Sequence, residues 1–317
     1  PGYNGIGYAY SWGTFAVGGW DWAFPSNQYG KTLIIGFRFK TSDSVQVEDR
    51  SMVSLHSISV LGTFENSQMT VSLVDNSKLR VKVGAVVTLA TTGAILSPDT
   101  WYHFEWKAYI HPSAGSYDLR IDGSTVLSGS GIDTQDSDNH IGFVRFSSIR
   151  GGGLLTEALM DDLYIMNSDG STLNDFLGTT PVVRVYYPVS DAGPNDFTPS
   201  TGTDHYALVD ETDEDFSDYL DGVTATDRES FLMQSVSAGT YKAVMQEVLV
   251  KTNSVGVRNI RQVVESGSTT SNGTSTPISD PNNPVALRRI LETDPDTGSS
   301  WSEAGINAAE FGVEVQT

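Results

Sequence analysis

Apolar and polar residues alternate strictly in part of the first half of the chain, and this alternation limits the fold more than any other feature. Between residues 102 and 110 every second side chain is apolar, and residues 117–121 follow the same rule. A period of two sends successive side chains to opposite faces of a β-strand, whereas a helix needs a period of about 3.6. The pattern therefore predicts two half-buried strands, with His103 on the side that faces solvent.

Further strands are predicted at 33–39, 69–74, 78–83, 141–146 and 158–166, with Gly, Ser and Asp between them. Asp122-Gly123 predicts a tight hairpin, because a primed turn needs positive φ angles that Gly adopts without strain. No convincing amphipathic helix interrupts these strands. Short strands at this spacing are typical of antiparallel sandwiches, so we expect an all-β fold made of two antiparallel β-sandwich domains.

The distribution of charge marks the boundary between the two domains. Residues 1–168 hold 16 acids and 11 bases, whereas residues 169–317 hold 23 acids and 8 bases. A polar, turn-rich stretch follows Met166, and Pro181 cannot continue a helix or a central strand. We therefore expect a first domain at 1–168, a linker at 169–180 and an acidic second domain at 181–317.

The second domain is less regular in sequence. Strands are predicted at 182–187, 241–251, 259–265 and 310–315, and the Ser- and Thr-rich stretch 266–283 is expected to be an exposed loop. One short helix is predicted near 301–309, where Ser300 and Glu303 have the spacing of a capping box.

Composition excludes several classes of function. The formal net charge is −20 and the chain has no Cys. Because an acidic protein repels phosphate, we expect neither nucleic acid nor a membrane as a partner. Disulfides, thiolate metal sites and thiol nucleophiles need Cys, and the common hydrolase, metalloprotease and nucleotide-binding motifs are missing. The sequence thus predicts no catalytic residues and a chain that is not an enzyme.

The densest group of acids lies at 210–215, inside a stretch from Asp191 to Glu229 that holds twelve acids and the single base Arg228. Like charges at this density repel one another, so we expect a solvated loop or an ion-pair surface for a basic partner. The candidate partner-binding residues are Asp210, Glu211, Asp213, Glu214 and Asp215. Glu211 and Asp213 are also the candidates for a glycan-cleaving carboxylate pair.

Oxygen donors at short spacing raise the question of calcium. The candidate ligands are Asp133, Asp136, Asp138 and Asn139, and Asp161 and Asp162 could add ligands from another strand. The glycine and the terminal glutamate of the EF-hand pattern are missing, and turn residues that bond their own backbone explain the loop equally well. We expect no cofactor, with calcium as the alternative.

Aromatic residues crowd the first thirty positions. Trp12, Trp20, Trp22 and Tyr29 are candidates for stacking on sugar rings or for burial in a partner. The alternative, given equal weight, is that some of them close the sandwich core as an edge strand.

The first domain resembles the concanavalin A-like or laminin G-like jelly roll. The resemblance is carried by Trp101-Tyr102 opening a strand, by the Asp122-Gly123 turn, and by the late strand that begins Met160-Asp161-Asp162. It covers residues 1–168 and implies that fold, which hosts lectins, adhesive modules, glycosidases and spacers. The carboxylate strand of the glycosidases has no counterpart in this sequence.

The second domain resembles the C-terminal sandwich of structural proteins of tailed-bacteriophage particles, through residues 206–211, 218–220 and 301–313. The resemblance implies a location in the virion, capsid or tail proteins as partners, and a homo-oligomer for which we expect a trimer. The predicted function is a non-enzymatic structural component of such a virion, a capsid decoration or spike protein. The alternatives are a carbohydrate-binding receptor-recognition module of a phage tail or fibre and, third, a glycan-cleaving enzyme.

Overall fold

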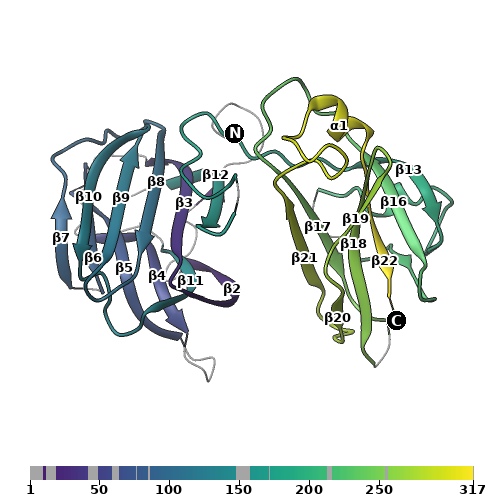
Figure 1. Ribbon diagram of the computed structural model, residues 1–317, viewed down its shortest axis with the longest axis horizontal. Helices are drawn as coiled ribbons and strands as arrows, with labels where there is room; N and C mark the ends of the chain where they lie inside the picture. Colours follow the sequence, from purple (N-terminus) through teal and green to yellow (C-terminus); the bar gives the residue numbers. More distant parts are fainter. Residues whose placement is uncertain are drawn as a thin grey trace. The chain divides into compact units, whose positions relative to one another are not determined.

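In the computed structural model the chain divides into two compact units, residues 1–183 and 184–317, and each unit is taken by itself below. The structure describes residues 10–11, 19–41, 49–58, 64–75, 77–84, 86–147, 158–170, 172–212, 216–253 and 256–316. The expected all-β fold of two antiparallel sandwiches is confirmed (Figure 1). Within the described ranges, no helix is long and apolar enough to cross a membrane.

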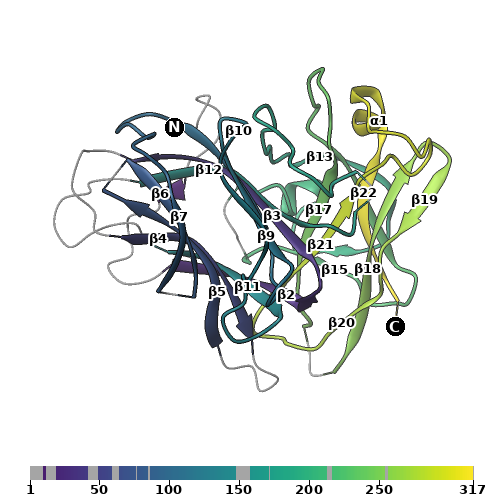
Figure 2. The ribbon, with the colours of Figure 1, turned by 60° about the vertical axis from the view of Figure 1, so that its left-hand side comes forward.

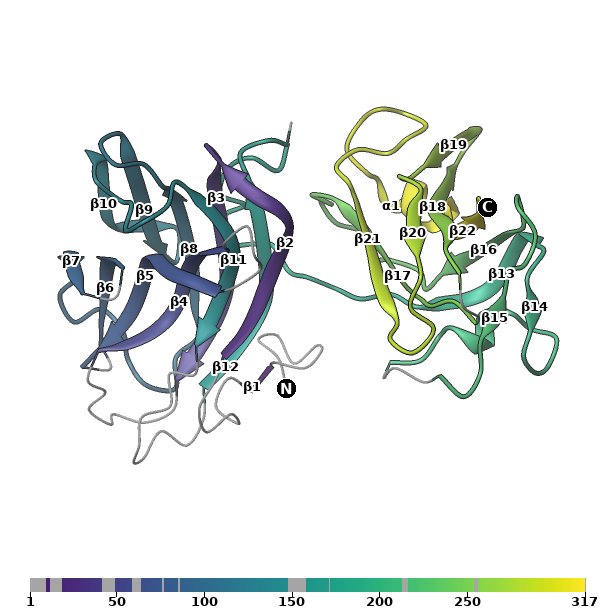
Figure 3. The same ribbon diagram turned by 90° about the horizontal axis from the view of Figure 1, so that it is seen from below.

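The first unit is a jelly roll of two six-stranded antiparallel sheets that lie face to face (Figure 3). Sheet A has the order β1-β12-β3-β8-β9-β10 and sheet B the order β2-β11-β4-β5-β6-β7. The strands are β1 Tyr10–Ser11, β2 Gly19–Tyr29, β3 Thr32–Thr41, β4 Arg50–Ile58, β5 Phe64–Val74, β6 Lys78–Val83, β7 Val87–Thr91, β8 Tyr102–Tyr109, β9 Gly115–Ile121, β10 Ser124–Ile132, β11 His140–Ser147 and β12 Ala158–Asn167. All the strands predicted in this half are present.

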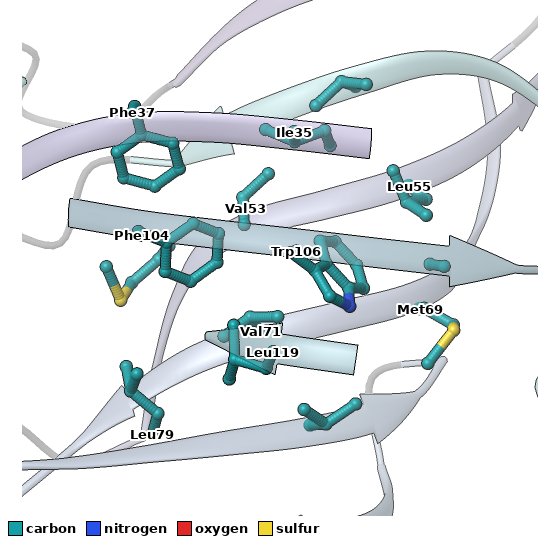
Figure 4. Close-up of a cluster of buried hydrophobic side chains, with 14 of the residues drawn as sticks. Ile35, Phe37, Val53, Leu55, Met69, Val71, Leu79, Phe104, Trp106 and Leu119 are labelled. Atoms are coloured by element: carbon teal, nitrogen blue, oxygen red, sulfur yellow. The ribbon is translucent and has the colours of Figure 1, made fainter. Parts of the chain in front are cut away.

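The core lies between the two sheets, where alternate side chains of both meet (Figure 4). Phe37 of β3 and Phe104 of β8 stack with ring centroids 4.5 Å apart. Trp106, also on β8, is 1% exposed, and Val71 of sheet B is fully buried. This alternation of inward-facing residues on both sheets is what the period of two in the sequence requires.

The predicted hairpin is confirmed at Asp122-Gly123, between β9 and β10. Ser124 pairs with Ile121 across the turn, and Asp122 and Gly123 have φ angles of 49° and 79°. Positive φ at both central residues is the signature of a type I′ turn.

The predicted solvent exposure of His103 is wrong, because the outer face of sheet A is covered. His103 is 1% exposed and Glu105 is fully buried, although both alternate with the core residues of β8. The cover is formed by residues 175–183, which bond to Glu105 and Arg38 on this face. A period of two indicates that a strand has an apolar and a polar face. Another segment of the chain can still cover the polar face.

The second unit is a smaller sandwich. Its main sheet has six strands, five in the order β13-β16-β22-β18-β19 and the sixth, β20, also paired to β18. A two-stranded sheet β17-β21 packs with it around Val264, Leu291 and Phe311. The elements are β13 Pro188–Asn195, β14 Thr198–Pro199, η1 Tyr206–Leu208, β15 Leu220–Asp221, β16 Arg228–Met233, β17 Val244–Val250, β18 Arg258–Ser266, β19 Thr269–Asn272, β20 Thr276–Ile278, β21 Val285–Leu291, α1 Glu303–Ala308 and β22 Glu310–Val315.

Three details of the second unit differ from the predictions. Residues 182–187 form no strand, and the first strand begins at Pro188. The predicted loop 266–283 contains β19 and β20, which both pair with β18. The predicted helix is present as α1 (Figure 2), but its N-cap is Ser302, whose Oγ accepts the Gly305 N–H at 3.0 Å, rather than Ser300.

The boundary between the units lies at Val183 and Arg184. The stretch 169–180 that we expected as a linker is part of the first unit, where its residues contact sheet A. The apolar Phe176 and Leu177 inside this polar stretch are half-buried, and their burial on sheet A explains why the first unit extends so far.

Candidate functional site

Three of the four aromatic candidates lie on β2. Trp12 lies outside the described residues. Trp20 and Trp22 belong to β2, where their backbones pair with Phe146 and Val144 of the core strand β11. Trp22 is half-buried, and its pairing with the core residue Val144 places it on the core-facing side of sheet B. Tyr29, at the end of β2, is 54% exposed.

Tyr29 rests against His140, the first residue of β11. The two residues are register partners, and their ring centroids lie 4.7 Å apart at an interplanar angle of 38°. His140 is only 7% exposed, and its Nε2 lies 3.1 Å from the Ile58 carbonyl oxygen. Since a carbonyl can only accept, that nitrogen donates. The imidazole is thus fixed, and it supports one side of an exposed phenol ring.

The predicted calcium loop leads directly into His140. Its backbone is held by Gln68, whose Oε1 accepts the N–H groups of Asp136, Ser137 and Asp138 at 3.0, 3.3 and 3.3 Å. Asp138 also accepts a 2.8 Å bond from Ser57 Oγ. A side chain that accepts three successive N–H groups fixes the loop without any ion.

The remaining members of the predicted calcium group do not assemble around one point. Asp133 accepts the Gln135 N–H at 3.0 Å, as a turn residue does. Asp136 and Asn139 are exposed. Asp162 is bound to Arg38 on sheet A, and Asp161 accepts the Asp162 N–H. Among the described residues there is no group of three or more His, Asp or Glu that could hold a metal ion.

Two of the predicted groups do meet at one end of sheet B. Tyr29 pairs with His140, and Asn139, an exposed amide, directly precedes that histidine. We call Tyr29, Asn139 and His140 the Tyr29 platform. It offers a supported aromatic ring, which can stack on an apolar ring face, and beside it an exposed amide, which can bond to hydroxyl groups.

The acidic residues of the second unit are partly described. Asp210 is exposed and Glu211 is half-buried, whereas Asp213, Glu214 and Asp215 lie outside the described residues. Other acids of the stretch 191–229 bond to backbone N–H groups of nearby loops. Asp191 accepts those of His205 and Tyr206 at 3.1 and 2.6 Å. Asp227 accepts those of Val223 and Thr224 at 3.1 and 2.7 Å. Part of the negative charge therefore holds loops in place.

A buried polar cluster on the outer face of sheet A was not predicted. At its centre, the Tyr164 hydroxyl donates to Glu105 Oε1 at 2.5 Å. The Tyr164 ring lies directly over Gly36, where a Cβ would stand 2.1 Å from a ring carbon. Only glycine leaves room for this ring. Burial and the Glu105 carboxylate raise the pKa of Tyr164 well above its usual range, so the tyrosine stays protonated and donates.

A bulge in β12 supplies the second pair of this cluster. The register of β12 on β3 shifts between Asp161 and Tyr164, and Asp162 has a φ of 51°. Such a bulge re-aims a side chain, and Asp162 Oδ2 accepts a 3.1 Å bond from Arg38 Nε with both side chains buried. Burial raises the pKa of the Asp162 carboxyl, partly offset by the N–H of Val183 and by Arg38.

Two atoms of the cluster have no hydrogen-bond partner. Glu105 Oε2 and His103 Nδ1 lie 3.9 Å apart, and both are buried. Burial lowers the pKa of His103, while the Glu105 charge acts in the opposite direction. The sequence holds one signal for this cluster. Polar residues at 103, 105 and 107 share a strand face, but the segment that buries them lies about seventy residues further on.

The second unit holds a smaller buried pair. His205 Nδ1 lies 3.0 Å from Glu229 Oε1, and the other Glu229 oxygen accepts the Phe197 N–H at 3.2 Å. Glu229 is fully buried, and burial raises its pKa. The pair joins β16 to the loop before η1.

No protein-family model matches the sequence, and no curated protein sequence matches it. Solved structures resemble the chain over about half its length. The Trypanosoma rangeli sialidase matches with a TM-score of 0.31 and 14% identity, over 42% of this chain and 20% of the sialidase. An endo-β-1,4-glucuronan lyase from Trichoderma reesei matches with a TM-score of 0.38 and 14% identity, over 52% and 76% of the two chains. A family 7 alginate lyase matches with a TM-score of 0.36 and 14% identity, over 46% and 65%.

These likenesses contradict the prediction that the chain is not an enzyme, since all three solved proteins are enzymes. That prediction is withdrawn. The chain spans a fifth of the sialidase, and at these TM-scores no activity passes from the solved proteins to this one.

Proposed function

We propose that the first unit binds carbohydrate, and that the Tyr29 platform is its contact surface. The supporting observation is an exposed tyrosine ring held against a buried histidine. A ring that is already fixed loses little conformational freedom when a ligand stacks on it, so more of the contact energy appears as affinity. The exposed Asn139 amide, directly before His140 in the sequence, adds a donor and an acceptor beside it.

A glycan array probed with the whole protein and with Tyr29→Ala tests this function. We expect binding by the unaltered chain and a loss of about tenfold in affinity, or about 1.4 kcal/mol, in the variant. Tyr219→Ala is the matched control, because Tyr219 is 52% exposed and lies in the second unit. Equal binding by Tyr29→Ala and the unaltered chain, or no binding to any glycan, would refute the proposal.

The array also examines calcium when it is run with and without a chelator. The Gln68 bonds hold the loop without an ion, so we expect chelation to leave glycan binding unchanged. The virion role and the trimer stay predictions from the sequence of the second domain, which neither the described contacts nor the comparisons test.

A further inference from the structure

Residues 175–183, which we call the strap, lie across the outer face of sheet A without joining it as a strand. The strap is anchored at both ends. Lys107 Nζ lies 2.5 Å from Asp175 Oδ1, and Asp162 Oδ1 accepts the Val183 N–H at 2.9 Å. These anchors belong to β8 and β12, so the strap spans several strands.

Between its anchors the strap is recognised much as a bound peptide would be. The Phe176 ring lies 4.0 Å from the Arg120 guanidinium and 4.5 Å from Lys107 Nζ, measured to the ring centroid. Glu105 Oε1 accepts the Gly178 N–H at 2.9 Å, and Arg38 donates to the Thr179 carbonyl. The face thus binds an acid, an aromatic ring, one backbone donor and one backbone acceptor, in that order along the chain.

The closed strap is weakly held compared with a sheet strand. The Asp175 side chain is 70% exposed, and exposed ion pairs contribute little. The strap has no ladder of paired backbone bonds. It also lies across the face on which Glu105 Oε2 and His103 Nδ1 are buried without a hydrogen-bond partner. A buried polar atom without a hydrogen bond is unfavourable, and lifting the strap would open the Glu105 side chain to water.

We propose that the outer face of sheet A is a peptide-binding face whose ligand is the chain's own strap, and that the strap detaches while the sandwich stays folded. The strap ends where the first unit ends. Its release adds residues 175–183 to the connection between the units. Nine extended residues span up to about 30 Å, so release of the strap lengthens the connection between the units.

The test uses a fluorescent peptide of residues 172–183 and the whole protein. In the double variant Asp175→Ala, Phe176→Ala the chain's own strap is weakened, so the free peptide should bind to the vacated face. The unaltered chain, whose face is occupied, should bind the peptide at least tenfold more weakly. A peptide with the same two alanines should not bind to either protein. Asp169→Ala is the control variant, because the Lys31–Asp169 pair lies at the surface outside the strap. This variant should bind the peptide as weakly as the unaltered chain does.

Amide exchange of the unaltered protein keeps the proposal falsifiable if the double variant does not fold. The Gly178 and Val183 amides should exchange at least tenfold faster than those of Phe37 and Phe104 in the paired core strands, because strap opening needs no global unfolding. Exchange at the same rate as the core would overturn the proposal. So would a folded double variant that fails to bind the peptide.

Discussion

Tyr164 and Glu105 show how a single glycine decides the chemistry of a strand face. Gly36 is the direct neighbour of both residues across β12 and β8. Its missing side chain lets the Tyr164 ring lie on the backbone and brings the hydroxyl to the Glu105 carboxylate. The same carboxylate oxygen then accepts the strap N–H of Gly178. The buried acid is tolerated because its charge is met by hydrogen bonds from two directions.

Removing the Tyr164 hydroxyl should destabilise the first unit. In Tyr164→Phe the buried Glu105 keeps only the Gly178 donor, and a buried carboxylate that loses a partner costs about 1–3 kcal/mol. Urea unfolding followed by fluorescence measures the change. Tyr29→Phe is the control, since Tyr29 is more than half exposed, and it should unfold like the parent. A Tyr164→Phe midpoint equal to the parent's would show that the hydroxyl contributes nothing.

His103 should make the first unit less stable in mild acid. Burial lowers the pKa of His103 below the ordinary 6.5. The Glu105 and Asp122 charges raise this pKa, whereas the Arg38 charge lowers it further. Below pH 6.5 the unfolded chain therefore takes up a proton that the folded chain does not, so the free energy of unfolding falls as the pH drops. In His103→Gln this contribution is absent, and the stability lost between pH 7 and pH 5 should be smaller than in the parent.

Urea unfolding midpoints of the parent and of His103→Gln, measured at several pH values, check this prediction. The other histidines are common to both proteins, so the difference between the two slopes belongs to position 103. A steeper loss in His103→Gln than in the parent would contradict the sign of the shift.

At the scale of elements, the sequence predicted the positions of most strands but not which strand faces are buried. The alternation at 102–110 located β8, and Asp122-Gly123 located the hairpin, because both depend on neighbouring residues. Burial of His103 depends on the strap, and the support of Tyr29 depends on the register of β2 on β11. Both involve partners about seventy or more residues away in sequence, which local patterns do not report. Residues 266–283 were mistaken for a loop because β19 and β20 are short and polar.

The pairing of β3 with β12, in which Gly36 lies opposite Tyr164, gives a prediction at this scale. In Gly36→Ala the new methyl group meets the Tyr164 ring at 2.1 Å, so the ring must move and the Glu105 bond is lost. Overpacking of this kind costs about 1–3 kcal/mol. Gly93→Ala is the matched control, because nothing lies within 4 Å of its Cβ position. Thermal unfolding should separate the two variants, and equal melting temperatures would show that the ring is not held against Gly36.

At the scale of the whole molecule, the two units differ in how their acids are used. The first unit buries Glu105 and Asp162 beside cations and donors on a sheet face. The second unit carries most of the net charge. Its acids, such as Asp191 and Asp227, accept hydrogen bonds from backbone N–H groups of its loops. A domain rich in loops has many backbone donors without ladder partners, and carboxylates satisfy them. The acidic character is thus partly a consequence of the loop-rich fold.

The boundary at Val183 predicts where the chain can be cut. A fragment ending at Val183 keeps the strap and should melt at the same temperature as the first unit within the whole protein. A fragment ending at Ser168 loses the bonds to Glu105, Arg38 and Asp162 and opens the outer face of sheet A to water. Three such bonds contribute about 1 kcal/mol each, so its melting temperature should be roughly 5–10 °C lower. It should still fold, because the core between the sheets does not include the strap. Circular dichroism melts of the two fragments check this, and equal melting temperatures would show that residues 169–180 are the linker that the sequence predicts.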